Sequence, residues 1–444
     1  MTARTGRGGD RSGHGKLRRA GALPPGPREP AALQTLEWVV RPTAFLRRCA
    51  AAYGEAFTIR LSFDDAPLVL VWHPDAVRAV YGASPEVARR GGSPGPLRPV
   101  AGPRSILLAD GDEHLRIRRL MLPPFHGDRV AGYRAVVVEV AAEHVARWPR
   151  GRPVEALGLM QELTLAVILR AVFGTDDPRL AGDIRATLGV ATSLPRAVAM
   201  SLAQRDLGPR SPWGAFIRRM AVVDEQLMAL IARRRESGDG VDVLGQLIAA
   251  GLDDAELRDH LVTLLAAGHE TTAGALAWAI ERLARAPEAL ARVRAGDEEW
   301  IDAVVKETLR IRPVLTVAPR KLAAPLRVDG LDLPAGVHVA PCIYLVHRRE
   351  DLYPDAGAWR PERWLGAGAP ESFAWIPFGG GVRRCVGASF ATMEMAEVLR
   401  VVAAELDLAP VDARSERMRR RGLTLQPGAG ARVVLSAASS SASS

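Results

Sequence analysis

The sequence predicts a mainly α-helical fold with a minor β portion, and three observations support that prediction. Apolar residues recur at helical spacing through most of 129–285. Short runs of strand type, bounded by turn residues, occur over 56–73 and 328–346. A chain of 444 residues with 48% hydrophobic and 25% charged residues is of globular type and can bury a large core.

Turn and capping signals place the other elements. The run 56–73 divides into two strands around Asp64 and Asp65, which are turn-forming residues. The pattern of 110–125 predicts a short helix that ends at a Pro-Pro pair, because proline lacks the N–H that a helix interior needs. Helices are also expected over 33–53, 254–285 and 297–311, and a last helix is expected to begin near Ser389.

The two ends of the chain differ in composition from the rest. Residues 1–29 are basic and contain no apolar run, so we expect a disordered tail without a signal peptide or membrane anchor. Residues 437–444 consist of alanine and serine and are expected to form a second disordered tail. One domain is therefore expected over 30–436.

Cysteine content and charge narrow the class of protein. The cysteines are three, an odd number, and lie far apart, which argues against a disulfide framework and fits a reducing, cytoplasmic compartment. The formal net charge is +9, but basic residues are spread along the chain, so nucleic-acid binding is not expected. The positive charge is better explained by association with an acidic protein partner.

The helix expected over 254–285 has an unusual centre, which reads AAGHETTAG. Glycine in a helix interior costs about 1 kcal/mol, and threonine costs less. One explanation is a close helix crossing that requires small residues. The other is a ligand that needs space at Gly268, the hydroxyl of Thr271 and the carboxylate of Glu270.

The segment FGGGVRRCVG, residues 378–387, surrounds Cys385 with glycine and positive charge. Only the thiolate of cysteine is a good metal ligand or nucleophile, and an ordinary thiol has a pKa of about 8.5. Arg383 and Arg384 supply cations, and the N-terminus of the helix that follows favours an anion. The glycines let backbone N–H groups turn toward the sulfur. The sequence therefore predicts a loop that holds a sulfur anion.

Three kinds of site use a thiolate. A nucleophile needs a histidine base, and none of the nine histidines lies within 348–444. A zinc site needs further cysteine or histidine ligands at short spacing. A single thiolate with a glycine loop suits an iron macrocycle, which brings its own four in-plane ligands.

The loop fits the pattern F-x-x-G-x-R-x-C-x-G at Phe378, Gly381, Arg383, Cys385 and Gly387. It resembles the haem-binding loop of the cytochrome P450 family. Three further segments resemble motifs of that family in the same order along the chain. They are AGHETT at 267–272, ETLR at 307–310 and PER at 361–363, the last followed by Trp364 where phenylalanine is usual.

The resemblance covers about 30–435 and implies the P450 fold, with a long central helix that crosses a haem b group. It implies that Cys385 is the iron ligand. On the opposite face of the haem it implies that Gly268 lies beside the cofactor. Glu270 and Thr271 would then deliver protons during O₂ activation.

Glu307 and Arg310 also carry a physical argument. Glu307 lies in an apolar helical stripe with Trp300 and Val304, where a carboxylate is costly unless it is paired. Arg310, three residues further on, can reach it. The alternative is an ordinary surface pair. The resemblance implies that Arg363 completes a structural clamp that positions the cysteine loop.

The propionate groups of a haem need cations. By resemblance, His114 and Arg118, four residues apart on the helix within 110–125, would bind them, with help from Arg320 and Arg383. The alternative for each of these residues is an ordinary solvated basic side chain. Cys49 and Cys342 are expected to be structural, since neither lies in a glycine loop.

The activity implied is that of a monooxygenase that hydroxylates or epoxidises a hydrophobic small molecule, such as a fatty acid, terpenoid, polyketide or steroid. Too few residues follow Cys385 to form a reductase, so electrons are expected from a ferredoxin or flavodoxin with its reductase, and a monomer is expected. The alternatives are a peroxygenase or isomerase on the same haem, or a haem-binding sensor without turnover. The expected substrate contacts are 85–106, 186–220 and 314–317.

Overall fold

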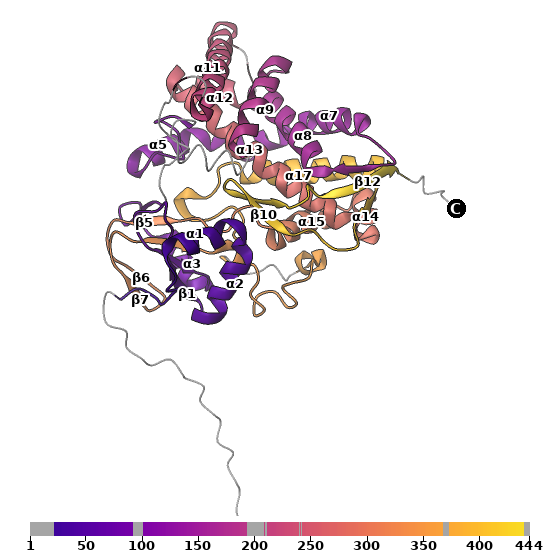
Figure 1. Cartoon of the computed structure of the whole chain (residues 1–444). Coiled ribbons are helices and arrows are strands. Elements are labelled where there is room, and N and C mark those ends of the chain that lie inside the picture. The colour runs from indigo at the N-terminus through magenta and orange to yellow at the C-terminus, as the bar shows by residue number, and fades with distance from the viewer. Residues whose placement is uncertain are drawn as a thin grey trace, which may run out of the picture.

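Helices form most of the molecule, as predicted, and the strands form small sheets beside them (Figure 1). The computed structural model describes residues 22–91, 101–192, 208, 211–238, 240, 242–366 and 373–438. The helices are α1 (Ala31–Val40), α2 (Pro42–Tyr53), α3 (Pro74–Gly82), α5 (Gly111–Met121), α6 (Asp128–Gly132), α7 (Arg134–Arg147), α8 (Ala156–Ala171), α9 (Pro178–Thr192), α11 (Pro212–Ser237), α12 (Val243–Ala249), α13 (Asp254–Leu283), α14 (Pro287–Arg294), α15 (Glu298–Ile311), α16 (Ile343–Val346) and α17 (Ala388–Glu405).

The strands are β1 (Ala56–Ile59), β2 (Leu68–Val71), β3 (Ala88–Arg90), β4 (Pro153–Glu155), β5 (Arg320–Leu322), β6 (Leu326–Val328), β7 (Leu331–Leu333), β8 (His338–Pro341), β9 (Leu406–Pro410), β10 (Met418–Arg421), β11 (Thr424–Pro427) and β12 (Arg432–Ala437). The largest sheet has the order β1-β2-β8-β5-β3, in which β2 and β8 run parallel and the other pairs run antiparallel. A second sheet has the order β4-β12-β9, and β10 and β11 form a hairpin. Among the described helices, none combines the length and apolar character needed to cross a bilayer.

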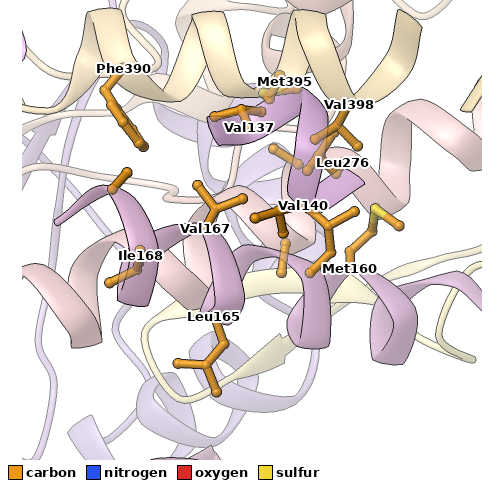
Figure 2. Close-up of a cluster of buried hydrophobic side chains, with 14 of the residues drawn as sticks. Val137, Val140, Met160, Leu165, Val167, Ile168, Leu276, Phe390, Met395 and Val398 are labelled. Carbon is orange, nitrogen blue, oxygen red and sulfur yellow. The ribbon is translucent and has the colours of Figure 1, made fainter. Parts of the chain in front are cut away.

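The main hydrophobic core lies where α7, α8, α13 and α17 meet, and Figure 2 shows side chains from all four. Helix α8 buries side chains around most of its circumference, as a helix inside a core must. Each fully buried side chain of leucine size contributes roughly 1.5–3 kcal/mol through removal of apolar surface from water. The labelled core residues are Val137, Val140, Met160, Leu165, Val167, Ile168, Leu276, Phe390, Met395 and Val398.

Helix α13 runs through the centre of the molecule beside α8 (Figure 1). A capping box starts it, in which the Asp253 side chain accepts from the N–H of Glu256 and the Glu256 side chain accepts from the N–H of Asp253. The β10–β11 hairpin packs against this helix, and the N–H of Leu425 donates to the carbonyl of Val314 at 2.7 Å. The hairpin therefore lies between the centre of α13 and the segment 314–317.

Two predictions about the first 60 residues were wrong. The helix expected over 33–53 is two helices, because Pro42 lacks the N–H that would continue α1 and instead starts α2. The tail expected over 1–29 ends earlier than predicted. The carbonyls of Pro24 and Pro25 accept from Thr58 Oγ1 at 2.7 Å and from the Thr58 N–H at 3.0 Å. This segment pairs with β1, an edge strand whose backbone groups would otherwise be unsatisfied.

Candidate active site

The cysteine loop connects a short 3₁₀ turn, Gly381–Arg383, to the N-terminus of α17. The N–H of Cys385 donates to the carbonyl of Phe378 at 3.0 Å and closes the loop. Gly381 has a φ of 65°, and a Cβ built on it would lie 2.0 Å from the carbonyl oxygen of Tyr81. The glycines are needed here because the loop passes directly against Tyr81 of α3.

The thiol of Cys385 differs from the other two. Its side chain is exposed, whereas Cys49 and Cys342 are buried. Burial raises the pKa of Cys49 to about 11 and that of Cys342 to about 12, so both are inert structural thiols. Their burial agrees with the structural role expected for both.

The surroundings of the Cys385 thiol act on its pKa in two directions. The protein atoms around it raise the pKa of its thiol, while the N–H of Gly387 and the charges of Arg384 and Arg118 act in the opposite direction. The neighbouring protein atoms remove water from the sulfur, and this effect on the pKa outweighs the two charges although the residue as a whole is exposed. A metal ion bound to the sulfur would remove the proton outright. The donor set therefore fits a single metal–thiolate bond.

The centre of α13 is accessible on one side. Ala267 is exposed and Thr271 is half-buried, whereas Thr272 is 4% exposed. The hydroxyl of Thr271 donates to the carbonyl of Ala267 at 2.5 Å, so its lone pairs remain able to accept a hydrogen bond. The two neighbouring threonines therefore lie on different faces of α13.

Gly268 supports the close-crossing explanation. A Cβ built on it would lie 3.1 Å from Cδ1 of Ile168 on α8, so a larger residue would press against that helix. Contact of Gly268 with haem stays a prediction. Gly274, two turns nearer the C-terminus, is also packed, because its Cβ would lie 2.1 Å from Oε1 of Gln426.

Glu270 is turned toward α8 and the β10–β11 hairpin. Its Oε2 accepts from Nε2 of Gln161 at 3.0 Å, and its backbone carbonyl accepts from Nε2 of Gln426 at 3.2 Å. Its Oε1 is buried and has no hydrogen-bond partner among the described residues. Burial raises the pKa of the Glu270 carboxyl, while the Gln161 bond and the charge of Arg421 lower it. No local motif marked Gln161 or Gln426, which reach Glu270 from other parts of the chain.

Glu307 lies at the centre of the predicted clamp. Its carboxylate and the Arg310 guanidinium are both 0% exposed and form two parallel hydrogen bonds of 2.8 Å. Arg363 adds a bond of 3.1 Å, and the N–H of Arg360 adds one of 2.8 Å. The indole N–H of Trp364 donates to the second oxygen at 3.0 Å. A buried carboxylate with this many donors is fully compensated.

Two contacts join the clamp to the cysteine loop. Arg310 donates to the carbonyl of His347 at 2.6 Å, and Nε2 of His347 accepts from the N–H of Ile376 at 2.8 Å. Burial holds the pKa of His347 well below its usual value, so the ring is neutral and can accept this bond. The indole N–H of Trp375 also donates to the carbonyl of Lys306 at 3.2 Å. The chain that enters the loop is thereby fixed to α15.

The predicted propionate ligands gather around His114. This residue is 4% exposed, and its pKa falls to about 4 because of burial and the charges of Arg383, Arg118 and Arg320, against the opposing charge of Asp110. Arg383 pairs with Asp110 at 2.6 Å.

The other two guanidiniums of this cluster face the loop itself. Arg118 donates to the carbonyl of Arg384 at 2.6 Å, and Arg320 donates to the carbonyl of Gly380 at 3.3 Å. The positive charges of three guanidiniums beside His114 favour binding of an anionic ligand. The two negatively charged propionates of a haem would match them.

Comparisons with known proteins identify the family of this chain. The family model described as cytochrome P450 matches residues 24–430. The protein named cytochrome P450 135B1 of Mycobacterium tuberculosis (strain ATCC 25618 / H37Rv) is 39% identical over 93% of this chain and 91% of its own length. Cytochrome P450 138 of the same strain is 37% identical over 93% of this chain and 96% of its own.

Two solved structures share the fold. Retinoic-acid-bound cyanobacterial CYP120A1 has a TM-score of 0.81 and 24% identity, covering 94% of this chain and 99% of that one. The haem domain of cytochrome P450DA has a TM-score of 0.83 and 21% identity, covering 95% and 99%. The predicted fold is therefore confirmed. The chain belongs to the cytochrome P450 family of haem-thiolate monooxygenases, which bind haem b through a cysteine.

Proposed function

We propose that this monooxygenase hydroxylates or epoxidises a hydrophobic small molecule, such as a fatty acid, terpenoid, polyketide or steroid, with electrons from a separate ferredoxin or flavodoxin and its reductase. The observation that carries the proposal is the accessible side of α13 at Ala267 and Thr271. Leu264 and Val314, both partly buried, add apolar surface to the same region of the core. Of the three segments expected to contact the substrate, residues 92–100, 193–207 and 209–210 lie outside the described residues.

Bound haem supplies the O₂ activation and oxygen transfer, and the protein orients the substrate and handles protons. Cys385 would hold the iron, and Arg118, Arg320, Arg383 and His114 would hold the propionates. Thr271 can accept a hydrogen bond at Oγ1 while its own proton is held by the Ala267 carbonyl. Glu270 can store a proton, since burial raises the pKa of its carboxyl, and Gln161 holds it in place.

The ligand assignment is tested with the CO-bound ferrous protein. Cys385→Ala should abolish the long-wavelength absorption band that a thiolate ligand produces. Cys49→Ala and Cys342→Ala are the matched controls and should keep the band, because both thiols are buried with raised pKa values. A band that survives in Cys385→Ala would show that the iron ligand lies elsewhere.

Turnover separates the proposal from its alternatives. In a reaction with NADPH, a surrogate ferredoxin and its reductase, a monooxygenase forms oxidised product only when electrons and O₂ are both present. A peroxygenase would form product from hydrogen peroxide alone, and an isomerase would need neither. A sensor would form no product from any member of a hydrophobic compound library that displaces water from the iron.

The redox partner is proposed to be acidic. Arg119 and Arg384 are exposed, and Arg118, which precedes Arg119 on α5, bonds to the carbonyl of Arg384 in the cysteine loop. Positive charge on this face would attract an acidic ferredoxin or flavodoxin and would make association depend on salt. Arg119→Glu should raise the ferredoxin concentration needed for half-maximal rate with no change in the haem spectrum, because Arg119 is exposed and bonds to the Leu115 carbonyl of its own helix.

A further inference from the structure

Three side chains with metal-binding atoms meet on the five-stranded sheet, outside the haem site. Asp64 and Asp65 occupy the turn between β1 and β2, and His338 is the first residue of β8. One ligand atom from each of the three lies within 4.8 Å of the others. The parallel pairing of Leu68 with His338 brings the turn to this end of β8.

The side chains of His338 and Asp64 are buried, and each has a polar atom without a hydrogen bond among the described residues. His338 is 1% exposed, and the Asp64 side chain is 8% exposed. Nδ1 of His338 and Oδ1 of Asp64 lie 3.6 Å apart, and neither has a hydrogen-bond partner in the part of the chain that the structure describes. Buried polar atoms are rarely left in this state, because each unsatisfied group costs free energy.

The distance between His338 and Asp64 fits a metal ion bound to both. A tetrahedral ion with bonds of about 2.1 Å to nitrogen and oxygen holds its ligand atoms about 3.4 Å apart. The observed 3.6 Å between His338 Nδ1 and Asp64 Oδ1 is close to this value and long for a hydrogen bond. One imidazole with carboxylates suits zinc and its neighbours, whereas magnesium and calcium prefer oxygen ligands alone.

We propose that Asp64, Asp65 and His338 bind a divalent transition metal of the zinc type, with water as the fourth ligand. The ion would link the β1–β2 turn to β8. Two carboxylates meet here, and Lys321 supplies one positive charge beside them. Its Nζ lies 3.0 Å from Oδ2 of Asp65, and the two side chains are 43% and 72% exposed. An exposed pair of this kind is weak, so the ion can displace the lysine.

The test is equilibrium dialysis of the haem-loaded full chain against Zn²⁺, with bound zinc measured by elemental analysis. The wild type should bind one equivalent that equimolar Mg²⁺ does not displace. Asp64→Asn and His338→Gln should each weaken binding at least about 10-fold, as loss of a ligand does. Asp65→Asn should also weaken binding. Because Asp65 is exposed, this variant should fold even if Asp64→Asn or His338→Gln does not.

His73 provides a matched control. Its Nδ1 lies 3.7 Å from carboxylates of Asp75 and Asp329, but that nitrogen already accepts from the N–H of Asp75 at 3.3 Å. His73→Gln should therefore keep the bound zinc.

Lys321→Met removes the competing cation and should tighten binding. A simple histidine–aspartate pair without a metal would show no such gain. The proposal fails if the wild type binds no zinc equivalent, if Asp65→Asn and His338→Gln both retain it, or if His73→Gln alone loses it.

Discussion

The clamp at Glu307 and the centre of α13 both place polar groups inside the helical core, but they satisfy them in opposite ways. Glu307 and Arg310 are fully buried, and the surrounding chain supplies donors and acceptors for both. The centre of α13 leaves Thr271 accessible and one oxygen of Glu270 without a partner. The hydrogen bonds of the clamp hold its side chains in one geometry, as a structural role requires. The centre of α13 keeps atoms that can still form hydrogen bonds during the reaction.

The largest effect is expected in the clamp. Arg310→Ala leaves a buried carboxylate without its main partner and should cost about 3–5 kcal/mol. We expect little soluble protein and little bound haem, measured as yield and as haem per chain. Lys306→Ala on the same helix, which removes a partly exposed pair with Asp302, should behave as wild type. Soluble, fully haem-loaded Arg310→Ala protein would contradict the clamp interpretation.

Glu394 on α17 is a buried carboxyl that differs from those of Glu307 and Glu270. Its Oε1 has no hydrogen-bond partner among the described residues, and burial raises its pKa to about 8. An unfolded chain ionises this group near the ordinary value of 4.5, while the folded chain keeps the proton. Stability from this group is therefore present below pH 4.5 and is lost as the pH rises toward 8.

Glu394→Gln should match the wild type near pH 4.5 and exceed it by up to a few kcal/mol near pH 8, at about 1.4 kcal/mol per pKa unit. Denaturant unfolding at both pH values measures the difference. Glu397→Gln, which removes pairs with Arg134 and Arg400, should show no such gain at high pH. An equal effect of Glu394→Gln at both pH values would show that the carboxyl is already ionised in the folded state.

At the centre of α13 the expected effect is on turnover. Thr271→Ala removes an accessible hydroxyl, so the haem spectrum should persist while product per NADPH falls about 10- to 100-fold and hydrogen peroxide rises. All three quantities can be measured in one reconstituted reaction. Thr272→Ala is the control, because Thr272 is buried and should affect stability alone. Unchanged coupling in Thr271→Ala would make Thr271 an ordinary helix residue.

The smallest effect concerns Trp364, whose indole N–H is one of several donors to Glu307. Trp364→Phe removes this hydrogen bond and leaves the arginine bonds in place. The free energy of unfolding should fall by about 1.5–3 kcal/mol, as expected for one bond to a charged group. Thermal unfolding should show a lower midpoint with full haem content. A loss as large as that of Arg310→Ala would mean that the clamp depends on the indole.

Local signals predicted many elements and the centres of the site. Asp253 and Glu256 form the capping box that starts α13. Pro42 divides the first helical segment into two helices, and a proline inside a helical pattern is a signal for such a break. The three-residue spacing of Glu307 and Arg310 was enough to predict their pairing. Nothing local indicated that Gln161 and Gln426 meet Glu270, because they come from α8 and β11.

The sequence by itself determined the class of fold, the cysteine loop and the pairing of Glu307 with Arg310, since these depend on residues a few positions apart along one element. Only the tertiary structure decided which side of α13 stays accessible, that burial raises the pKa of Cys385, and that Asp64 meets His338. The physical reason is that these properties depend on how distant elements pack and how they exclude water. Packing of that kind is set by the whole core and not by any local pattern.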